Sequence, residues 1–404
     1  MATSPHLARS VVRGLLLAGA VGAGVAAHSI GRRYQNSDQK AIDWDQVRKV
    51  AVGISGGTSI RGDDRADLQQ HYRRWISEVE PHIAGYLHTT LPTPLETVFV
   101  FDRPQWIDAN IANFRVLFAP LEEVYDDVIV RGSLRAGPVV GGINQLVASS
   151  QIGLLLGYLA KRVLGQYDMA LLGREPMTSG KLYFLEQNVK GSEIKLSIPG
   201  DQFRLWICLH EATHAFEFEA HPWLATYLNE HIAEHMNLVT QQLRRIRLDA
   251  SFLEETVHRV VRSVTQGGHW LELLMSDDQR RVFQRLQSTM SLLEGYSNHV
   301  MDHIGIQLMP DYEDIKRKFE QRRSKRSVTD QIWSKLTGLD LKIEQYSLGE
   351  RFVNEIVAQR GIDFMNRVFD DPAQLPDMRE IRQPQRWIER LDGGGRRALA
   401  IRWG

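Results

Sequence analysis

Apolar residues recur at helical spacing along most of the chain beyond residue 35, whereas alternation of apolar and polar residues is confined to one short region. The helical pattern predicts helices at residues 43–54, 66–87, 104–124, 143–164, 202–220, 224–248, 253–264, 276–306 and 350–360. Pro81 is a possible break in the second of these. Strands are predicted at 182–185 and 194–198, followed by a turn at Pro199 and Gly200. The pattern therefore favours an α+β, predominantly helical fold with a small sheet just before the helix at 202–220.

The helix at 143–164 follows a glycine-rich stretch, residues 132–142, that is typical of a loop. Gly153 and Gly157 lie on one side of this helix, one turn apart. Because glycine has no side chain, we expect a neighbouring helix to pack closely against this side.

The helix at 202–220 carries the chain's most informative motif. Its first residue follows Asp201, a credible N-cap, and Pro222 disfavours its continuation. Its middle reads His210-Glu211-Ala212-Thr213-His214, which matches the H-E-x-x-H pattern of zinc peptidases. Residues four apart share a helix face, so both imidazoles can reach one ion while Glu211 lies beside them. The flanking apolar residues indicate that this helix is buried.

Composition limits the classes of function. With 404 residues and 43% apolar content, the chain is long enough for a substantial core, and we expect one domain over residues 36–404 after a separate segment, 1–35. The 49 basic and 49 acidic residues balance, so nothing favours a nucleic-acid partner. The single cysteine, Cys208, excludes a disulfide framework and a thiolate zinc cluster within one chain.

The N-terminal segment contains an uncharged run, residues 14–27, flanked by arginines. This run is shorter than the roughly 20 residues that a membrane-spanning helix needs. A cytoplasmic protein is the favoured interpretation, and membrane association through residues 9–33 remains an alternative. The sequence does not indicate an oligomeric state.

Two histidines on one helix need a third donor, because catalytic zinc usually takes three protein ligands and keeps a fourth position for water. The metzincin arrangement is excluded because Glu217 and Ala220 stand where that class has glycine and histidine. His221 lies on the same face but about two turns beyond His214, too far for one ion. A glutamate on a later helix is the remaining pattern, and Glu294 fits because its apolar neighbours imply burial. Asn298 and Asp302, one and two turns further on, are candidates for orienting a ligand.

A second motif competes with the first. Residues 231–235 read H-x-x-E-H, the inverted pattern of another zinc peptidase group. Polar residues surround most of this predicted helix, which suits a solvated surface better than a dry metal cavity. We therefore expect His210 and His214 to form the site.

A zinc ion held by His210, His214 and Glu294 would activate water and polarise an amide carbonyl, with Glu211 as general base. Tyr296, His299 and His303 are the candidate donors to the oxyanion.

The edge of strand 182–185 could bind an extended peptide. The basic run 316–326 could contact an acidic substrate or lipid, although a solvated face is favoured there. The alternatives are a scaffold that retains zinc without turnover, and hydrolysis of a non-peptide amide or ester.

The chain resembles the zincin-like type 2 metallopeptidases of bacteria and archaea, which are often labelled as hydrolases associated with deazaflavin-coenzyme biosynthesis. The resemblance extends from about residue 40 to the end. The matching positions are Asp43-Trp44, residues 157–168, Leu182-Tyr183-Phe184, residues 203–206 joined to 210–214, Pro222-Trp223-Leu224, Glu294-Gly295, Val300-Met301-Asp302, Lys342 and Gln345-Tyr346. It implies a zincin-like α+β core in which His210, His214 and Glu294 bind zinc and Glu211 is the catalytic carboxylate.

Overall fold

A computed structural model of the chain describes residues 41–57, 59–125, 138–167, 181–246, 275–324 and 339–402. The N-terminal segment 1–35, the predicted helix at 253–264 and the end of the basic run lie outside these residues. Across the described ranges, every helix is too short or too polar to span a bilayer.

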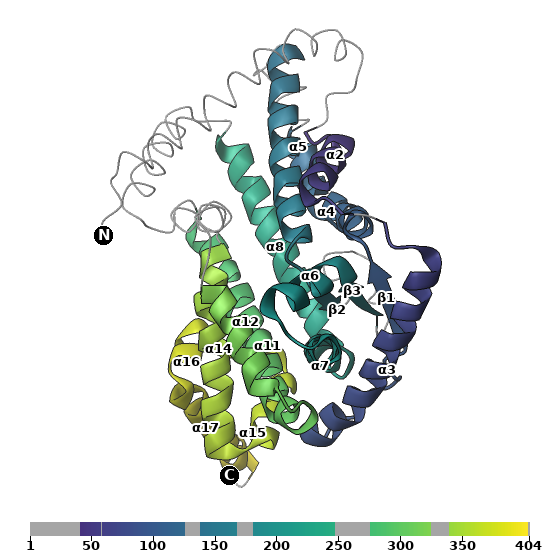
Figure 1. Ribbon diagram of the computed structural model, residues 1–404. Helices are drawn as coiled ribbons and strands as arrows, with labels where there is room; N and C mark the ends of the chain where they lie inside the picture. The colour runs from purple at the N-terminus through teal and green to yellow at the C-terminus, as the bar shows by residue number, and fades with distance from the viewer. Residues whose placement is uncertain are drawn as a thin grey trace, which may run out of the picture.

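Helices dominate the fold, as the sequence pattern predicts (Figure 1). The elements, in chain order, are α2 (Trp44–Ser55), α3 (Gly62–Leu87), β1 (Thr97–Phe101), α4 (Arg103–Tyr125), α5 (Pro138–Ala160), β2 (Gly165–Tyr167), β3 (Lys181–Leu185), α6 (Glu186–Leu196), α7 (Gly200–Glu219), α8 (Trp223–Ile246), α11 (Asp277–Leu308), α12 (Tyr312–Ser324), α14 (Leu339–Arg360), α15 (Ile362–Asn366), the 3-10 turns η3 (Arg367–Phe369) and η4 (Pro372–Gln374), α16 (Met378–Arg382) and α17 (Pro384–Arg402). The predicted α+β, predominantly helical class is confirmed.

Local sequence signals explain several helix ends. Asp43 caps α2, because its carboxylate accepts hydrogen bonds from the amides of Asp45 and Gln46. Ser276 opens α11 with a reciprocal capping box that involves Gln279. The possible break at Pro81 does not occur: α3 continues through it. Proline has no amide proton to donate to the carbonyl one turn earlier in the helix. Because Pro81 is exposed, that carbonyl can bind water instead.

The sheet has three strands in the order β1-β3-β2. β1 runs parallel to β3, from Thr97 opposite Lys181 to Phe101 opposite Leu185, and β2 is antiparallel to β3. The prediction of a strand at 182–185 is confirmed, but this strand is central, so β1 and β2 occupy both of its edges. The prediction that its edge binds a peptide is therefore wrong.

The predicted strand at 194–198 is also wrong, because these residues complete α6 and its cap. Ile194 is 68% exposed, so the alternation of residues in this segment does not reflect a half-buried strand. Ser197 takes a left-handed conformation, with φ of 50°, and its amide bonds the last carbonyls of α6.

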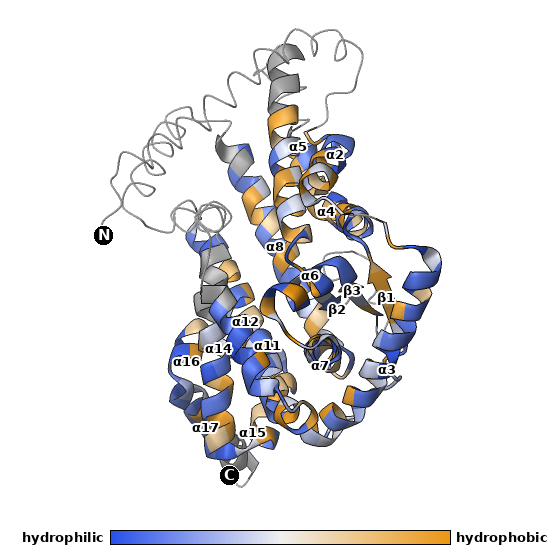
Figure 2. Ribbon diagram, in the orientation of Figure 1, coloured by the Kyte–Doolittle hydropathy of each residue, from blue (hydrophilic) through white to orange (hydrophobic). Residues whose placement is uncertain are grey.

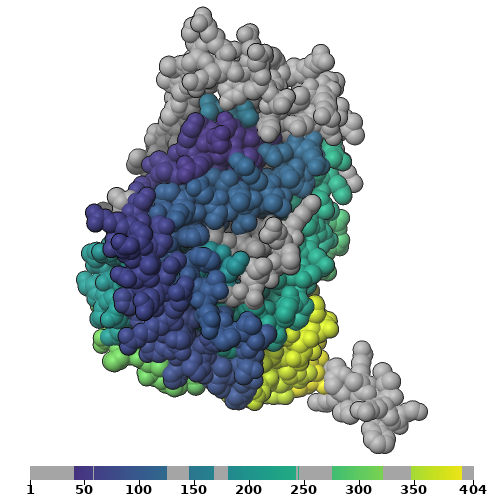
Figure 3. All heavy atoms as spheres, turned by 90° about the vertical axis from the view of Figure 1, so that its right-hand side faces the viewer, coloured from purple at the N-terminus to yellow at the C-terminus, as the bar shows by residue number. Residues whose placement is uncertain are grey.

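Two hydrophobic clusters divide the interior. The smaller one joins α2, α4 and α5, and Figure 2 shows apolar residues in orange on the coloured part of α5. In α5, Gly153 and Gly157 lie against the backbone carbonyls of Val47 and Ala51 in α2, which confirms the predicted close packing. Figure 3 shows a face formed largely by the N-terminal part of the chain, in purple and blue, with C-terminal residues, in yellow, at its lower right.

The larger cluster surrounds α7, the helix that carries the H-E-x-x-H motif. Side chains of α3, α11, α14 and the sheet all contribute to it. α7 contacts α3 on one side and α11 on another, and β2 lies alongside it (Figure 1). The motif is therefore held from several directions by packed secondary structure.

Candidate metal centre

α7 is buried around most of its circumference, as expected of an active-site helix. It begins at Gly200, so Pro199 is the N-cap residue and the cap predicted at Asp201 is wrong. Asp201 lies instead in the first turn, where a negative charge interacts favourably with the helix dipole. The helix ends at Glu219, before Pro222.

The structure brings three potential ligands together. His210 and His214 of α7 and Glu294 of α11 each offer a donor atom, and these atoms all lie within 4.8 Å of one another. The nearest oxygen of Glu294 is 3.9 Å from Nε2 of His210. Donors of tetrahedral zinc, with bonds of about 2.0–2.2 Å, are spaced by roughly 3–4 Å, so small side-chain rotations would suffice for binding. The three side chains are 15–23% exposed, which leaves the cluster open to a small ligand.

The other ring nitrogens of the two histidines are already engaged. Nδ1 of His214 lies 2.7 Å from a carboxylate oxygen of Glu217 and 3.1 Å from the hydroxyl of Ser297. Nδ1 of His210 lies 3.1 Å from the sulfur of Met301. These contacts leave Nε2 of each imidazole directed at the cluster, and they resemble the outer hydrogen bonds that orient metal-bound histidines in proteins.

Sequence reasoning missed Glu217 and Ser297 in this role. In the sequence, Glu217 stands out only as a mismatch to the metzincin pattern. Its place three residues after His214, within an apolar run, is a signal that could have indicated a buried carboxylate on the same side of the helix. Ser297 also lies 3.4 Å from Glu217, so it links α7 to α11.

Burial and mutual charge set the proton affinities of the site. Burial, opposed in part by the neighbouring His214, raises the pKa of Glu211 to about 7. The pKa of Glu217 rises to about 7 for the same reasons. Burial alone would lower the pKa of His214, but the charge and hydrogen bond of Glu217, together with Glu294, raise it to about 9. The pocket therefore concentrates negative potential that would favour a cation.

Glu211 lies against the edge strand β2 rather than in solvent. The backbone amide of Tyr167 donates a hydrogen bond to its carboxylate. At Gly165, a Cβ atom would lie 2.8 Å from the side chain of Glu211, closer than real Cβ atoms approach. Glycine at this position therefore makes room for the carboxylate.

The three predicted oxyanion donors have other partners. The hydroxyl of Tyr296 donates to Asn366, at 2.7 Å, within the core. Nε2 of His299 lies 2.6 Å from the hydroxyl of Tyr86, and the ring of His303 stacks on Tyr86 with centroids 3.9 Å apart. These contacts are made with α3 and with the last residue of α15, so the structure does not place these donors at the cluster.

Asp302 and Asn298, the two residues predicted to orient a ligand, differ in where the structure places them. Asp302 accepts hydrogen bonds from Tyr312 and Lys316, both at 2.5 Å, and therefore ties α11 to α12 instead of to a histidine. Asn298 is half-buried and lies one turn after Glu294 on the same face of α11.

The rival candidates do not join the cluster. The ring of His221 stacks on Phe369, with centroids 4.7 Å apart. In the competing motif, Nδ1 of His231 bonds the carbonyl of Tyr227, and His235 packs near Phe283. Within the ranges that the structure covers, His210, His214 and Glu294 are the one group of three or more such side chains close enough to share an ion.

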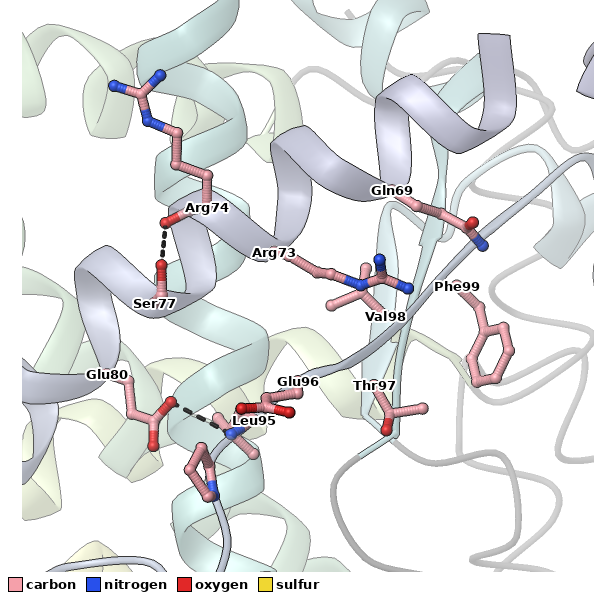
Figure 4. Close-up of a pocket in the computed structure, with 11 residues that line it drawn as sticks. Gln69, Arg73, Arg74, Ser77, Glu80, Leu95, Glu96, Thr97, Val98 and Phe99 are labelled. Carbon is pink, nitrogen blue, oxygen red and sulfur yellow. Dashed lines mark hydrogen bonds between the residues drawn. The ribbon is translucent and has the colours of Figure 1, made fainter. Parts of the chain in front are cut away.

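Two cavities lie outside the cluster. One of about 240 Å³ is bounded by Glu217, His221, Tyr296, the end of α3 and residues in and after α15. Another, of about 750 Å³, lies between α3 and the start of β1 (Figure 4). There, Arg73 extends toward Val98 while Glu80 accepts a hydrogen bond from the amide of Leu95. β3 separates β1 from β2, so this second cavity is at the opposite edge of the sheet from Glu211.

Comparison with known proteins agrees with this geometry. The sequence profile of the zincin-like metallopeptidase family matches residues 42–388. A crystal structure from Chloroflexus aurantiacus, described as "a putative hydrolase with a novel fold", is similar to the chain with 40% sequence identity and a TM-score of 0.65, over 87% of this chain and 99% of that one. A search of curated proteins gave no match. The match over most of the sequence shows that the chain belongs to the zincin-like metallopeptidase family.

Proposed function

We propose that the protein is a zinc-dependent hydrolase that cleaves amide bonds, with peptides as its substrates. The observation that carries the proposal is the convergence of His210 and His214 with Glu294, a residue some eighty positions downstream, into one cluster of donors. Two imidazoles and one carboxylate are a donor set that zinc uses in catalytic sites.

The residues fit the ion in three respects. The donors are imidazole and carboxylate groups of the right type, the outer nitrogen of each imidazole has a partner, and the surrounding carboxylates supply negative charge. When bound, zinc would act as a Lewis acid toward a carbonyl oxygen and increase the acidity of water. The described residues provide three donors rather than four, which favours a catalytic centre over a closed structural one.

Glu211 is proposed as the general base. Its pKa of about 7 allows it to accept a proton from water near neutral pH and then to release that proton to the leaving nitrogen. The amide of Tyr167 donates a hydrogen bond to the carboxylate, and the missing side chain at Gly165 leaves room for it beside His214.

Asn298 is the remaining candidate donor to the carbonyl oxygen. It shares a face of α11 with Glu294, whereas Tyr296, His299 and His303 bind elsewhere. The flanking positions Ser297 and Met301 contact the two histidines, so this face of the helix borders the cluster. A side-chain amide here could donate to an oxyanion as other amides do in hydrolases.

β2 supports a peptide as the substrate. It is an edge strand of the sheet formed by β1, β2 and β3, and it lies directly beside the proposed base. A peptide that extends this sheet would bond main-chain groups of β2 other than the Tyr167 amide, which Glu211 occupies, and would lie with an amide bond near Glu211.

The test compares the wild type with Glu211→Gln, using zinc analysis and an unbiased peptide-library cleavage assay. We expect both proteins to hold about one zinc ion per chain, and the variant to lose at least about 100-fold in cleavage rate. Glu219→Gln is a matched control, because Glu219 lies on the same helix but accepts a hydrogen bond from the phenol of Tyr167. Full cleavage by Glu211→Gln would exclude the proposed base. Zinc without any cleavage by the wild type would instead support a scaffold or a non-peptide substrate.

A further inference from the structure

At Gly295, the residue after Glu294, α11 packs against α14 with its backbone in direct contact. Real Cβ atoms stay at least 3.0 Å from neighbouring heavy atoms. A Cβ atom added to Gly295 would lie much closer than this to the carbonyl group of Gly349. A Cβ atom added to Gly349 would fall still deeper against the carbonyl of Ser291. Ser291 and Gly295 are one turn apart on the same face of α11, so the contact is a continuous seam between the two helices.

The other side of α11 faces the metal cluster. Ser297 contacts His214 and Glu217, and Met301 contacts His210. α11 is therefore fixed by two different neighbours, α7 through these side chains and α14 through the glycines. The lateral position of α11 determines where the carboxylate of Glu294 lies relative to the two imidazoles.

We propose that the contact between Gly295 and Gly349 positions Glu294 for metal binding, so that Gly349, in a helix with no proposed ligand, determines the affinity of the site. This inference rests on the proposed zinc centre. A methyl group at Gly349 would force the helices apart by on the order of 1 Å, because packed backbone cannot yield locally. Metal–ligand distances tolerate only about 0.2 Å, so a displacement of this size would disrupt coordination by Glu294.

The experiment measures the Kd for zinc of metal-stripped protein by competition with a chromophoric chelator, together with the Tm of each metal-free variant. We expect Gly349→Ala to bind zinc at least tenfold more weakly than the wild type at a temperature where both are folded. A purely structural contact would lower Tm and leave the Kd of the folded protein unchanged.

Gly157→Ala is the matched control, because it places a methyl group against the backbone of Ala51 between α5 and α2, in the other hydrophobic cluster. It should lower Tm without changing the Kd. Gly191→Ala, inside α6 where a Cβ meets nothing within 4 Å, should leave the Kd unchanged and raise Tm slightly, because alanine favours the helix. Zinc binding by Gly349→Ala within twofold of the wild type would overturn the inference.

Val353→Ala provides a second test should Gly349→Ala fail to fold. Val353 is fully buried one turn after Gly349 on α14, and its truncation adds no atoms. Val353→Ala should weaken zinc binding severalfold. Val47→Ala is the control, because Val47 is equally buried but lies on α2, and it should leave zinc binding unchanged. Equal zinc affinities of the two variants would contradict the inference. Failure of the wild type to bind zinc, or unchanged binding by His214→Ala, would instead contradict the proposed function and this inference with it.

Discussion

A carboxylate oxygen of Glu217 lies 2.7 Å from Nδ1 of His214, three residues earlier on the same helix. The hydrogen bond fixes the imidazole with Nε2 toward Glu294 and His210, and Ser297 braces the pair from α11. A partner of this kind also increases the basicity of a metal-binding histidine. Glu217 is therefore a positioning residue for the proposed zinc ligand.

Glu217→Gln keeps the shape of the side chain but removes its charge. We expect the Kd for zinc to increase by about 10–100-fold, the usual effect of losing such an outer partner. Zinc titration of the metal-stripped variant measures the change. Glu219→Gln, two residues on, should bind zinc like the wild type because Glu219 contacts Tyr167. Equal affinities of all three proteins would show that the hydrogen bond does not orient His214.

Gly165→Ala tests the space that β2 leaves for Glu211. The added methyl group would lie 2.8 Å from the Glu211 side chain and displace its carboxylate. Because Glu211 is not a proposed ligand, we expect zinc content to stay at the wild-type level while kcat falls at least about tenfold. Parallel loss of zinc and of activity would indicate a general disruption of the site instead.

Asn298→Ala tests the proposed donor to the carbonyl oxygen. Its loss should lower kcat by about 100-fold, as loss of one such donor does in other hydrolases, with little change in zinc affinity. Tyr296→Phe is a useful comparison, because it removes a hydroxyl that bonds Asn366 rather than the site. Steady-state kinetics on a cleaved peptide would distinguish the two variants, and identical kcat values for wild type and Asn298→Ala would exclude the role.

The stability of the metal-free protein should decrease as pH rises. Glu211 in the folded protein keeps its proton up to about pH 7, whereas the unfolded chain releases it near 4.5. The folded state therefore binds more protons in this interval, and the stabilisation that is present below pH 4.5 is lost as pH rises through 7. Glu211→Gln removes this contribution.

Thermal unfolding of the two metal-free proteins between pH 4.5 and 8 measures the effect. We expect the Tm of Glu211→Gln to rise relative to that of the wild type as pH increases across this range. A constant difference in Tm at every pH would show that ionisation of the buried Glu211 does not lower the stability of the folded protein.

The sequence predicted the helical class and the central strand because these depend on local periodicity. The long apolar pattern around Glu294 also placed that residue on a buried helix, and the fold brings it to the two histidines. β1 and β2 were not predicted, because short strands of this kind depend on pairing with β3 more than on their own residues. At 194–198, alternation indicated a strand, but α6 follows β3 directly and extends to Leu196, and Ile194 is exposed.

The site itself was predictable only in part. The H-E-x-x-H spacing fixes how His210 and His214 share a face, and any helix would present them in this way. Which residues touch their outer nitrogens depends on the distance between α7 and α11 and on side-chain rotamers, neither of which is encoded in a local pattern. For this reason Glu217, Ser297 and Met301 emerged only from the structure.

The central claim is that His210, His214 and Glu294 together hold one zinc ion, and zinc titration of Glu294→Ala tests it most directly. Asp302→Asn is the control, because Asp302 is a carboxylate of the same helix that binds Tyr312 and Lys316. We predict one tight zinc ion per chain in the wild type and in the control, and affinity at least about 100-fold weaker in Glu294→Ala. Wild-type affinity in Glu294→Ala would contradict the claim.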